Sequence, residues 1–152
     1  MELGLRGKKA LVTGASKGIG RACAEVLAEE GVDIVLVART AADLEAARAK
    51  IAGEHNVAVR THALDLSDSR NIDRLAADCA DTDILVNNAG AIPGGNIAQI
   101  DEARWREAWD LKVFGYINMT RRFYALMAER KKGAIVNILG AAGENPDFNY
   151  VA

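Results

Sequence analysis

The chain has 152 residues, of which 50% are hydrophobic, and this length and composition fit one domain with an ordinary core. The 19 basic and 21 acidic residues give a formal charge of -2, which argues against a surface for nucleic acid or anionic membranes. No apolar run approaches the roughly 20 residues that span a bilayer, and no apolar signal core precedes the first expected strand. We therefore expect a soluble cytoplasmic protein without a nucleic-acid or membrane partner.

Short apolar runs that are typical of buried strands alternate along the chain with segments of helical spacing. Thr40 and Ser67 stand at the start of two of these helical segments and are expected to cap them. The expected elements are, in chain order, strand 8–14, helix 18–31, strand 32–39, helix 40–54, strand 57–65, helix 67–79, strand 83–90, helix 101–130 and strand 133–139.

This alternation predicts an α/β fold, a doubly wound parallel sheet with helices on both faces. Because helices would cover both faces, each strand is expected to be apolar on both sides. The expected strand order is 3-2-1-4-5. A ligand site is expected outside the carboxyl ends of the strands, at the switch between the first and the fourth strand.

Three glycines lie between the first strand and the first helix, in the segment "TGASKGIG". Gly14 permits a tight turn, Gly18 leaves room for a phosphate to approach the backbone, and Gly20 lets the helix pack closely on the sheet. The N-terminus of that helix would offer unpaired N–H groups and partial positive charge to a diphosphate. A turn with a purely structural role is the alternative.

The spacing Thr-Gly-x-x-x-Gly-x-Gly, followed by "NNAG" at 87–90 after the fourth strand, resembles the short-chain dehydrogenase/reductase family. The resemblance extends over essentially the whole chain. It implies a single Rossmann-like dinucleotide-binding domain over 1–152, truncated after the fifth strand. It also implies an NAD(P)-dependent oxidoreductase that transfers a hydride between the nicotinamide and a small carbonyl or alcohol substrate.

The resemblance implies a set of cofactor-binding residues at the ends of the strands. Asp65 and Leu66 match the family's adenine-contacting pair, with a capping or turn role as the alternative for the aspartate. The residues that match the family's contacts to the pyrophosphate and ribose are Gly14, Ser16, Gly18, Ile19, Gly20, Asn87, Ala89 and Gly90.

The end of the second strand favours NADP(H) over NAD(H). An NAD site needs an acidic residue there to accept from the ribose 2′-hydroxyl, whereas this chain has Ala38 and Arg39. Lys17 in the glycine segment adds a second cation, and both cations suit a 2′-phosphate. Solvated surface positions are the alternative for Arg39 and Lys17, and NAD(H) remains the alternative cofactor.

The catalytic positions depart from the family's pattern of an asparagine in the long helix, a serine after the fifth strand and Tyr-x-x-x-Lys. At these places the chain has Lys112, Gly140 and Tyr150, and the motif's lysine, expected at position 154, would lie beyond Ala152. The resemblance implies Tyr150 as the acid/base. We hypothesise that Lys112 assists by lowering the pKa of the tyrosine or by relaying protons. A lysine whose ammonium reaches only water is the alternative.

The expected helix 101–130 carries two apolar faces. Leu111, Phe114 and Ile117 lie on the second face, which with the family's pairing through this helix predicts a homo-oligomer, a dimer or tetramer. Cover by another part of the same chain is the alternative. At 100° per residue the first face collects Trp105, Trp109, Lys112, Tyr116, Met119, Phe123 and Met127.

The cysteines and histidines do not suggest a site. Cys23 and Cys79 lack metal-ligand spacing and are predicted to be buried free thiols, so no metal is expected. His55 and His62 lie apart from any catalytic or metal-binding set.

The fifth strand would be an apolar sheet edge, so we expect a fragment or the ordered part of a longer protein. The chain alone is expected to lack turnover, because nothing after Tyr150 remains to hold a substrate. The alternative function is a dinucleotide-binding module with decayed catalysis, acting as a sensor or scaffold. Gly140 and Lys112 keep that alternative open.

Overall fold

A computed structural model describes residues 3–140 and residue 144 of the chain. Five parallel strands form one sheet in the order β3-β2-β1-β4-β5, which confirms the expected α/β fold and strand order. The register places Val12 beside Leu36 on one side and Val86 on the other. The strands are β1 (Lys9–Thr13), β2 (Asp33–Ala38), β3 (Val59–Ala63), β4 (Ile84–Asn87) and β5 (Ala134–Asn137).

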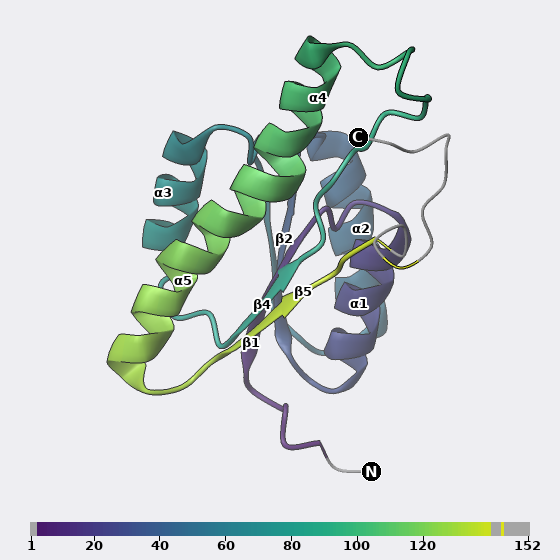
Figure 1. Ribbon diagram of the computed structural model, residues 1–152. Coiled ribbons are helices and arrows are strands. Elements are labelled where there is room, and N and C mark those ends of the chain that lie inside the picture. The colour runs from purple at the N-terminus through teal and green to yellow at the C-terminus, as the bar shows by residue number, and fades with distance from the viewer. Residues whose placement is uncertain (1–2, 141–143, 145–152) are drawn as a thin grey trace.

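Helices cover both faces of the sheet (Figure 1). One core layer lies between the sheet and α1 with α2, and the other lies between the sheet and α3 with α5. Successive residues of a strand point to opposite faces, so Val12 packs into the first layer and Leu11 into the second. The helical elements are α1 (Gly18–Glu29), α2 (Ala41–Glu54), α3 (Ser69–Asp78), α4 (Glu102–Trp109), the π-helical turn η1 (Asp110–Gly115) and α5 (Tyr116–Arg130).

The expectation that every strand is apolar on both faces is wrong for β3. The inner strands β1, β2 and β4 are buried almost throughout, because each has a neighbouring strand on both sides and a helix over each face. In contrast, β3 is an edge strand that exposes Arg60. In the described part of the chain β5 pairs with β4 alone, and Val136 is 48% exposed, as expected of an apolar edge.

The expected helix 101–130 is interrupted by η1, and this changes which side chains share a face. A π-helical turn holds more residues than an α-helical turn, so the faces before and after it no longer line up at 100° per residue. Met119, Phe123 and Met127 are buried as expected, but Trp109 is 48% exposed. The prediction that Trp109 shares one face with these three residues is therefore wrong.

Leu111 follows the alternative stated for the second face, which is cover by another part of the same chain. Its side chain packs against the core layer beneath α3 and α5, whereas Phe114 and Ile117 are exposed. Trp105 contacts Trp109 edge-to-face, with ring centroids 6.3 Å apart. The outer surface of this helix therefore contains tryptophan side chains that the sequence pattern had assigned to the core.

Two predicted helix caps are not formed. Thr40 occupies the N-cap position of α2, but its side chain makes no capping hydrogen bond. The cap of α3 is Asp68, whose carboxylate accepts from the Arg70 amide at 2.9 Å. Ser67 lies one residue before this N-cap, and its hydroxyl donates to the Asp65 carboxylate at 2.8 Å.

The prediction of two buried thiols is confirmed for Cys79 and wrong for Cys23, which is half-buried. The Sγ atom of Cys79 lies 3.7 Å from Nε2 of His62. Burial raises the pKa of the Cys79 thiol and lowers the pKa of His62, so both groups favour their neutral forms. We assign this contact to packing between β3 and α3.

Candidate functional site

The glycine segment turns sharply between β1 and α1. Gly14 and Gly18 have φ angles of +65° and +59°, in the left-handed region that favours glycine. A Cβ atom at Gly20 would lie 2.5 Å from the Gly14 carbonyl oxygen, so only glycine allows α1 to approach the turn this closely. The N-cap residue of α1, Lys17, makes no side-chain capping bond. The Lys17 side chain therefore does not accept hydrogen bonds from the first N–H groups of α1. An anion site at a helix N-terminus uses such N–H groups.

The chain after β4 is bonded directly to the glycine segment. Thr13 Oγ1 accepts from the backbone N–H groups of Asn88 and Ala89, each at 2.9 Å. The Asn88 amide donates to the carbonyl oxygens of Thr13 at 3.0 Å and Gly14 at 3.2 Å. Asn88 and Thr13 were not among the predicted site residues. The signal that points to Asn88 is a second amide directly after a buried strand that ends in Asn87.

Asn87 points away from this junction. Its side chain is 0% exposed and lies under α5, where its amide donates to Asn137 Oδ1 at 2.9 Å and Thr120 Oγ1 at 3.2 Å. The Oδ1 atom of this side-chain amide has no hydrogen-bond partner within the described residues. Adjacent strand residues face opposite sides, so Asn88 rather than Asn87 reaches the glycine segment.

A cavity of about 310 Å³ opens at the carboxyl ends of β1, β2 and β4. It brings together most of the predicted cofactor-binding residues, namely Gly14, Ser16, Lys17, Ile19, Arg39, Leu66, Ala89 and Gly90. Gly18, Gly20, Asp65 and Asn87 do not line it. The residues that line it without having been predicted are Val37, Ala38, Thr40, Asp43, Leu64, Asn88, Ala91 and Leu111.

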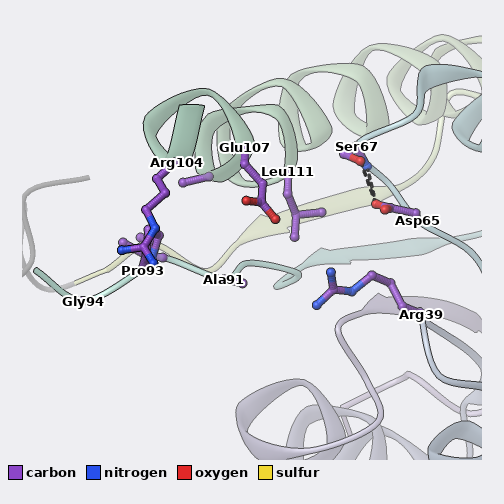
Figure 2. A pocket seen from close by; sticks show the side chains of 11 residues that line it. Arg39, Asp65, Ser67, Ala91, Pro93, Gly94, Arg104, Glu107 and Leu111 are labelled. Carbon is purple, nitrogen blue, oxygen red and sulfur yellow. Dashed lines mark hydrogen bonds between the residues drawn. The ribbon is translucent and has the colours of Figure 1, made fainter. Parts of the chain in front are cut away.

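A second cavity of about 360 Å³ adjoins the first and shares Arg39, Ala91 and Leu111 with it. Figure 2 shows Arg39 extending from the end of β2 on the opposite side from Leu111 and Glu107. The side chain of Arg39 is exposed and forms no ion pair within residues 3–140. Its guanidinium is therefore free to bind an anionic group in either cavity.

Asp65 takes a turn role and also lines the second cavity. One of its carboxylate oxygens accepts from the Ser67 amide at 3.0 Å and from the Ser67 hydroxyl at 2.8 Å. Figure 2 shows this pair at one end of the cavity. The turn fixes the carboxylate at the cavity wall and leaves its second oxygen without a hydrogen bond to the described residues.

Lys112 packs against Gly90, near the carboxyl ends of β4 and β5. Its Nζ donates to the Tyr116 hydroxyl at 2.7 Å and to the Ile138 carbonyl oxygen at 2.9 Å. A Cβ atom at Gly90 would lie 2.7 Å from Lys112 Cδ, so this glycine makes room for the lysine stem. Burial lowers the pKa of Lys112 and raises the pKa of Tyr116 to about 12.

The predicted acid/base, Tyr150, lies outside the described residues. Gly140, which stands where the family pattern has a serine, is the last residue of the described range 3–140. Gly140 is exposed, and a Cβ atom there would contact nothing within 4 Å. Glycine has no side chain, so Gly140 cannot donate the hydroxyl hydrogen bond that a serine would offer to a substrate oxygen.

The described residues show neither a membrane span nor a metal cluster. Within residues 3–140, no helix is both long and apolar enough to cross a bilayer. In the same range, no group of three or more His, Cys, Asp or Glu side chains is arranged to hold a metal ion.

The comparisons with known proteins agree with this geometry. The model of the short chain dehydrogenase family matches residues 8–152. Galactitol 2-dehydrogenase from Rhizobium johnstonii is 38% identical over 91% of this chain and 55% of its own length. The 3-oxoacyl-(acyl-carrier-protein) reductase of Staphylococcus aureus is 32% identical over 95% of this chain and 62% of its own length.

A solved structure with the same arrangement is L-sorbose reductase from Gluconobacter frateurii, in complex with NADPH and L-sorbose. Its TM-score is 0.93 at 32% identity, over 99% of this chain and 59% of that protein. The chain therefore spans somewhat more than half the length of these three relatives.

Proposed function

Since this chain belongs to the short-chain dehydrogenase/reductase family, we propose that it is the cofactor-binding part of an NADP(H)-dependent oxidoreductase. The single observation that carries the proposal is the cavity between β1 and β4, which is lined by the glycine segment, Arg39 and the chain after β4. Ligands of doubly wound sheets bind at this switch point. The substrate we propose is a small carbonyl compound or the corresponding alcohol.

The two cavities suit the parts of a dinucleotide. The uncapped N-terminus of α1 is the site that we assign to the diphosphate. Leu66 and Leu111 offer apolar walls to an adenine, and Asp65 has a carboxylate oxygen available for an amino group. When bound, NADPH supplies the hydride. The residues of this chain bind the cofactor and orient it against the ends of β4 and β5.

We further propose that the site prefers NADP(H). Arg39 and Lys17 line the same cavity, and no acidic residue ends β2. The L-sorbose reductase structure contains NADPH. Full-length protein should bind NADPH more tightly than NADH in calorimetry. Arg39→Ala should weaken NADPH binding about tenfold or more, since a hydrogen bond to a charged group contributes about 1.5–3 kcal/mol.

The matched control for this test is Arg121→Ala, since Arg121 is an exposed arginine on α5 that lines neither cavity. It should leave the affinity for both cofactors unchanged. NADH affinity should also be nearly unchanged in Arg39→Ala, because NADH lacks the 2′-phosphate. Tighter binding of NADH than NADPH by the unmodified protein would refute the preference.

Reduction of a carbonyl adds a hydride to its carbon and a proton to its oxygen. We assign the proton to the Tyr150 hydroxyl, as the family resemblance implies, and a supporting role to the Lys112 ammonium. The Lys112 ammonium donates to the Ile138 carbonyl oxygen just after β5, so it lies near the strand ends where we place the reaction. With Gly140 in place of the serine, other groups must stabilise the substrate oxygen.

A module that binds the cofactor without turnover is the second candidate, and Gly140 and Lys112 favour it. The discriminating experiment incubates the full-length protein with NADPH and a panel of ketones and ketoses, and with NADP⁺ and the matching alcohols and polyols. The panel includes sugars because two relatives are named for galactitol and L-sorbose. Oxidation of NADPH with at least one compound is expected. Tight cofactor binding without turnover on the whole panel would favour the binding module.

The 152-residue chain alone should be inactive.

We also propose that the outer face of α4, η1 and α5 packs against a second copy of the chain. A shallow cavity of about 270 Å³ on this face is lined by Trp105, Trp109 and Phe114, which are unusual side chains for open solvent. Interfaces between subunits are enriched in such aromatic residues.

Location in the cytoplasm stays a prediction from composition.

A further inference from the structure

Tyr116 is the first residue of α5 and follows Lys112 across the end of the π-helical turn. We propose that Tyr116 is a positioning residue, which together with the Ile138 carbonyl oxygen holds the Lys112 ammonium at the carboxyl ends of β4 and β5. This proposal rests on the oxidoreductase function proposed above. It assigns a role to a side chain that the sequence pattern had placed among core residues.

Three hydrogen bonds close a triangle between the helix and β5. Lys112 Nζ donates to the Tyr116 hydroxyl at 2.7 Å and to the Ile138 carbonyl oxygen at 2.9 Å. The Tyr116 hydroxyl itself donates to the same carbonyl oxygen at 3.1 Å. The ammonium also lies 4.4 Å from the centroid of the tyrosine ring, which is within the range of a cation–π contact. Tyr116 thus contacts the ammonium through both its hydroxyl and its ring.

The backbone around this triangle leaves the lysine little freedom. The lysine stem packs where a side chain at Gly90 would be. A Cβ atom at Gly115 would lie 3.2 Å from the Leu66 carbonyl oxygen, so the turn sits closely against the chain after β3. Turns of this type often occur at functional sites. The close packing at Gly90 and Gly115 favours one position of the ammonium.

The charge balance explains why the lysine needs this support. Burial lowers the pKa of Lys112, and no charged group among the described residues offsets that effect. The Tyr116 hydroxyl and the Ile138 carbonyl accept stronger hydrogen bonds from a charged ammonium than from a neutral amine, so both favour the protonated lysine. The pKa of Tyr116, raised by burial to about 12, keeps its hydroxyl protonated over the working pH range.

An ammonium has three N–H groups. Within the described residues two of them are used, by Tyr116 and Ile138. The third is the group that we assign to an oxygen of the substrate, of the cofactor ribose or of Tyr150. Tyr116 itself touches none of the reacting atoms in this assignment and acts through Lys112.

The test is Tyr116→Phe in the full-length protein, with lysines labelled with ¹³C at Cε and followed by NMR over a pH titration. The signal of Lys112 is assigned by its loss in Lys112→Gln. Phenylalanine keeps the ring and removes the hydroxyl, so the charged form of Lys112 loses one acceptor. The pKa of Lys112 should therefore fall by about one unit, the size expected for a hydrogen bond to a charged group. The alkaline limb of the kcat profile should move to lower pH by a similar amount.

The matched control is Tyr124→Phe, because Tyr124 lies on the same helix, is 66% exposed and has a hydroxyl with no hydrogen bond to the described residues. It should leave the Lys112 titration unchanged. A folded Tyr116→Phe variant with an unchanged Lys112 pKa would overturn the proposal. The titration needs no turnover, so it tests Tyr116 even where the oxidoreductase assay fails.

The unmodified protein supplies a second measurement, which does not depend on a variant that folds. The ammonium protons of Lys112 should exchange with water more slowly than those of Lys131, an exposed lysine after α5. This protection is expected because hydrogen-bonded, half-buried protons are shielded from solvent. Equal exchange rates for the two lysines would show that the triangle is not maintained, and would overturn the proposal.

Discussion

Tyr150→Phe in the full-length protein should lower turnover at least about 100-fold and leave NADPH affinity nearly unchanged. General acid–base catalysis contributes about 10²–10⁴ to a rate, and the phenyl ring has no proton to exchange with the substrate oxygen. Cofactor affinity should persist because the described cavity for the dinucleotide is formed by other residues. The measurements are steady-state kinetics and calorimetric titration with NADPH.

The expected loss depends on how the tyrosine is activated. A free phenol has a pKa of about 10 and is almost entirely protonated at neutral pH. A nearby cation favours the anion and lowers that pKa. Lys112 Nζ is a cation already held at the end of β5, by Tyr116 and Ile138. Lys112→Met should therefore reduce turnover in the same direction as Tyr150→Phe.

Two outcomes would contradict the assignment of Tyr150. Turnover of Tyr150→Phe at the unmodified rate would exclude it as the acid/base. A parallel loss of turnover and of NADPH affinity would indicate damage to the binding site instead of removal of a proton donor. Tyr124→Phe is the control for loss of an exposed phenol on α5 and should have no effect.

Gly20→Ala should weaken both the fold and cofactor binding. The added Cβ atom would lie 2.5 Å from the carbonyl oxygen of Gly14 and would also meet the Asn88 amide. That amide bonds the chain after β4 to the glycine segment, so the clash forces α1 or Asn88 to move. Overpacking of this kind costs about 1–3 kcal/mol, and the free energy of unfolding should fall by that amount.

The loss of NADPH affinity in Gly20→Ala should be about tenfold or more, because the N-terminus of α1 would shift relative to the turn. Gly53→Ala is the matched control. Gly53 lies in α2, has no neighbour that a Cβ atom would meet, and has an ordinary helical backbone. That variant should be as stable as the unmodified protein or more stable by up to about 1 kcal/mol. Equal denaturation midpoints and NADPH affinities for both variants would refute the role of Gly20.

The fold could be predicted because its determinants are local and repeated. Each apolar run is short enough for a strand, and each of the first four is followed by a segment with helical spacing, so alternation and right-handed crossovers leave few topologies. The glycine spacing also predicted where the site lies. Gly14 and Gly18 have φ angles near +60°, a conformation that favours glycine, so glycines at these two positions indicate the turn from the sequence alone.

Local patterns failed where two local choices compete. Ser67 and Asp68 are both good caps, and the structure uses Asp68 because the helix begins at Ser69, which places Asp68 at the N-cap and Ser67 one residue before it. The pattern in 101–130 is compatible with one continuous α-helix, so it cannot show a turn with a different residue count. With this turn in the helix, Trp109 lies at the surface and Lys112 contacts the Ile138 carbonyl oxygen just after β5.

The sequence by itself determined the alternation of strands and helices and the glycine turn, because these follow from periodicity and backbone geometry over short segments. The expected strand order came from the rules of doubly wound sheets, and the type of ligand site from the family resemblance. The tertiary structure alone decided which amide of the pair at 87–88 faces the glycine segment and what surrounds Lys112. These contacts join residues far apart in the chain, such as Asn88 with Thr13 and Lys112 with Ile138. Which of two neighbouring side chains faces a partner depends on the packing of whole strands and helices, and a local pattern contains no information about that packing.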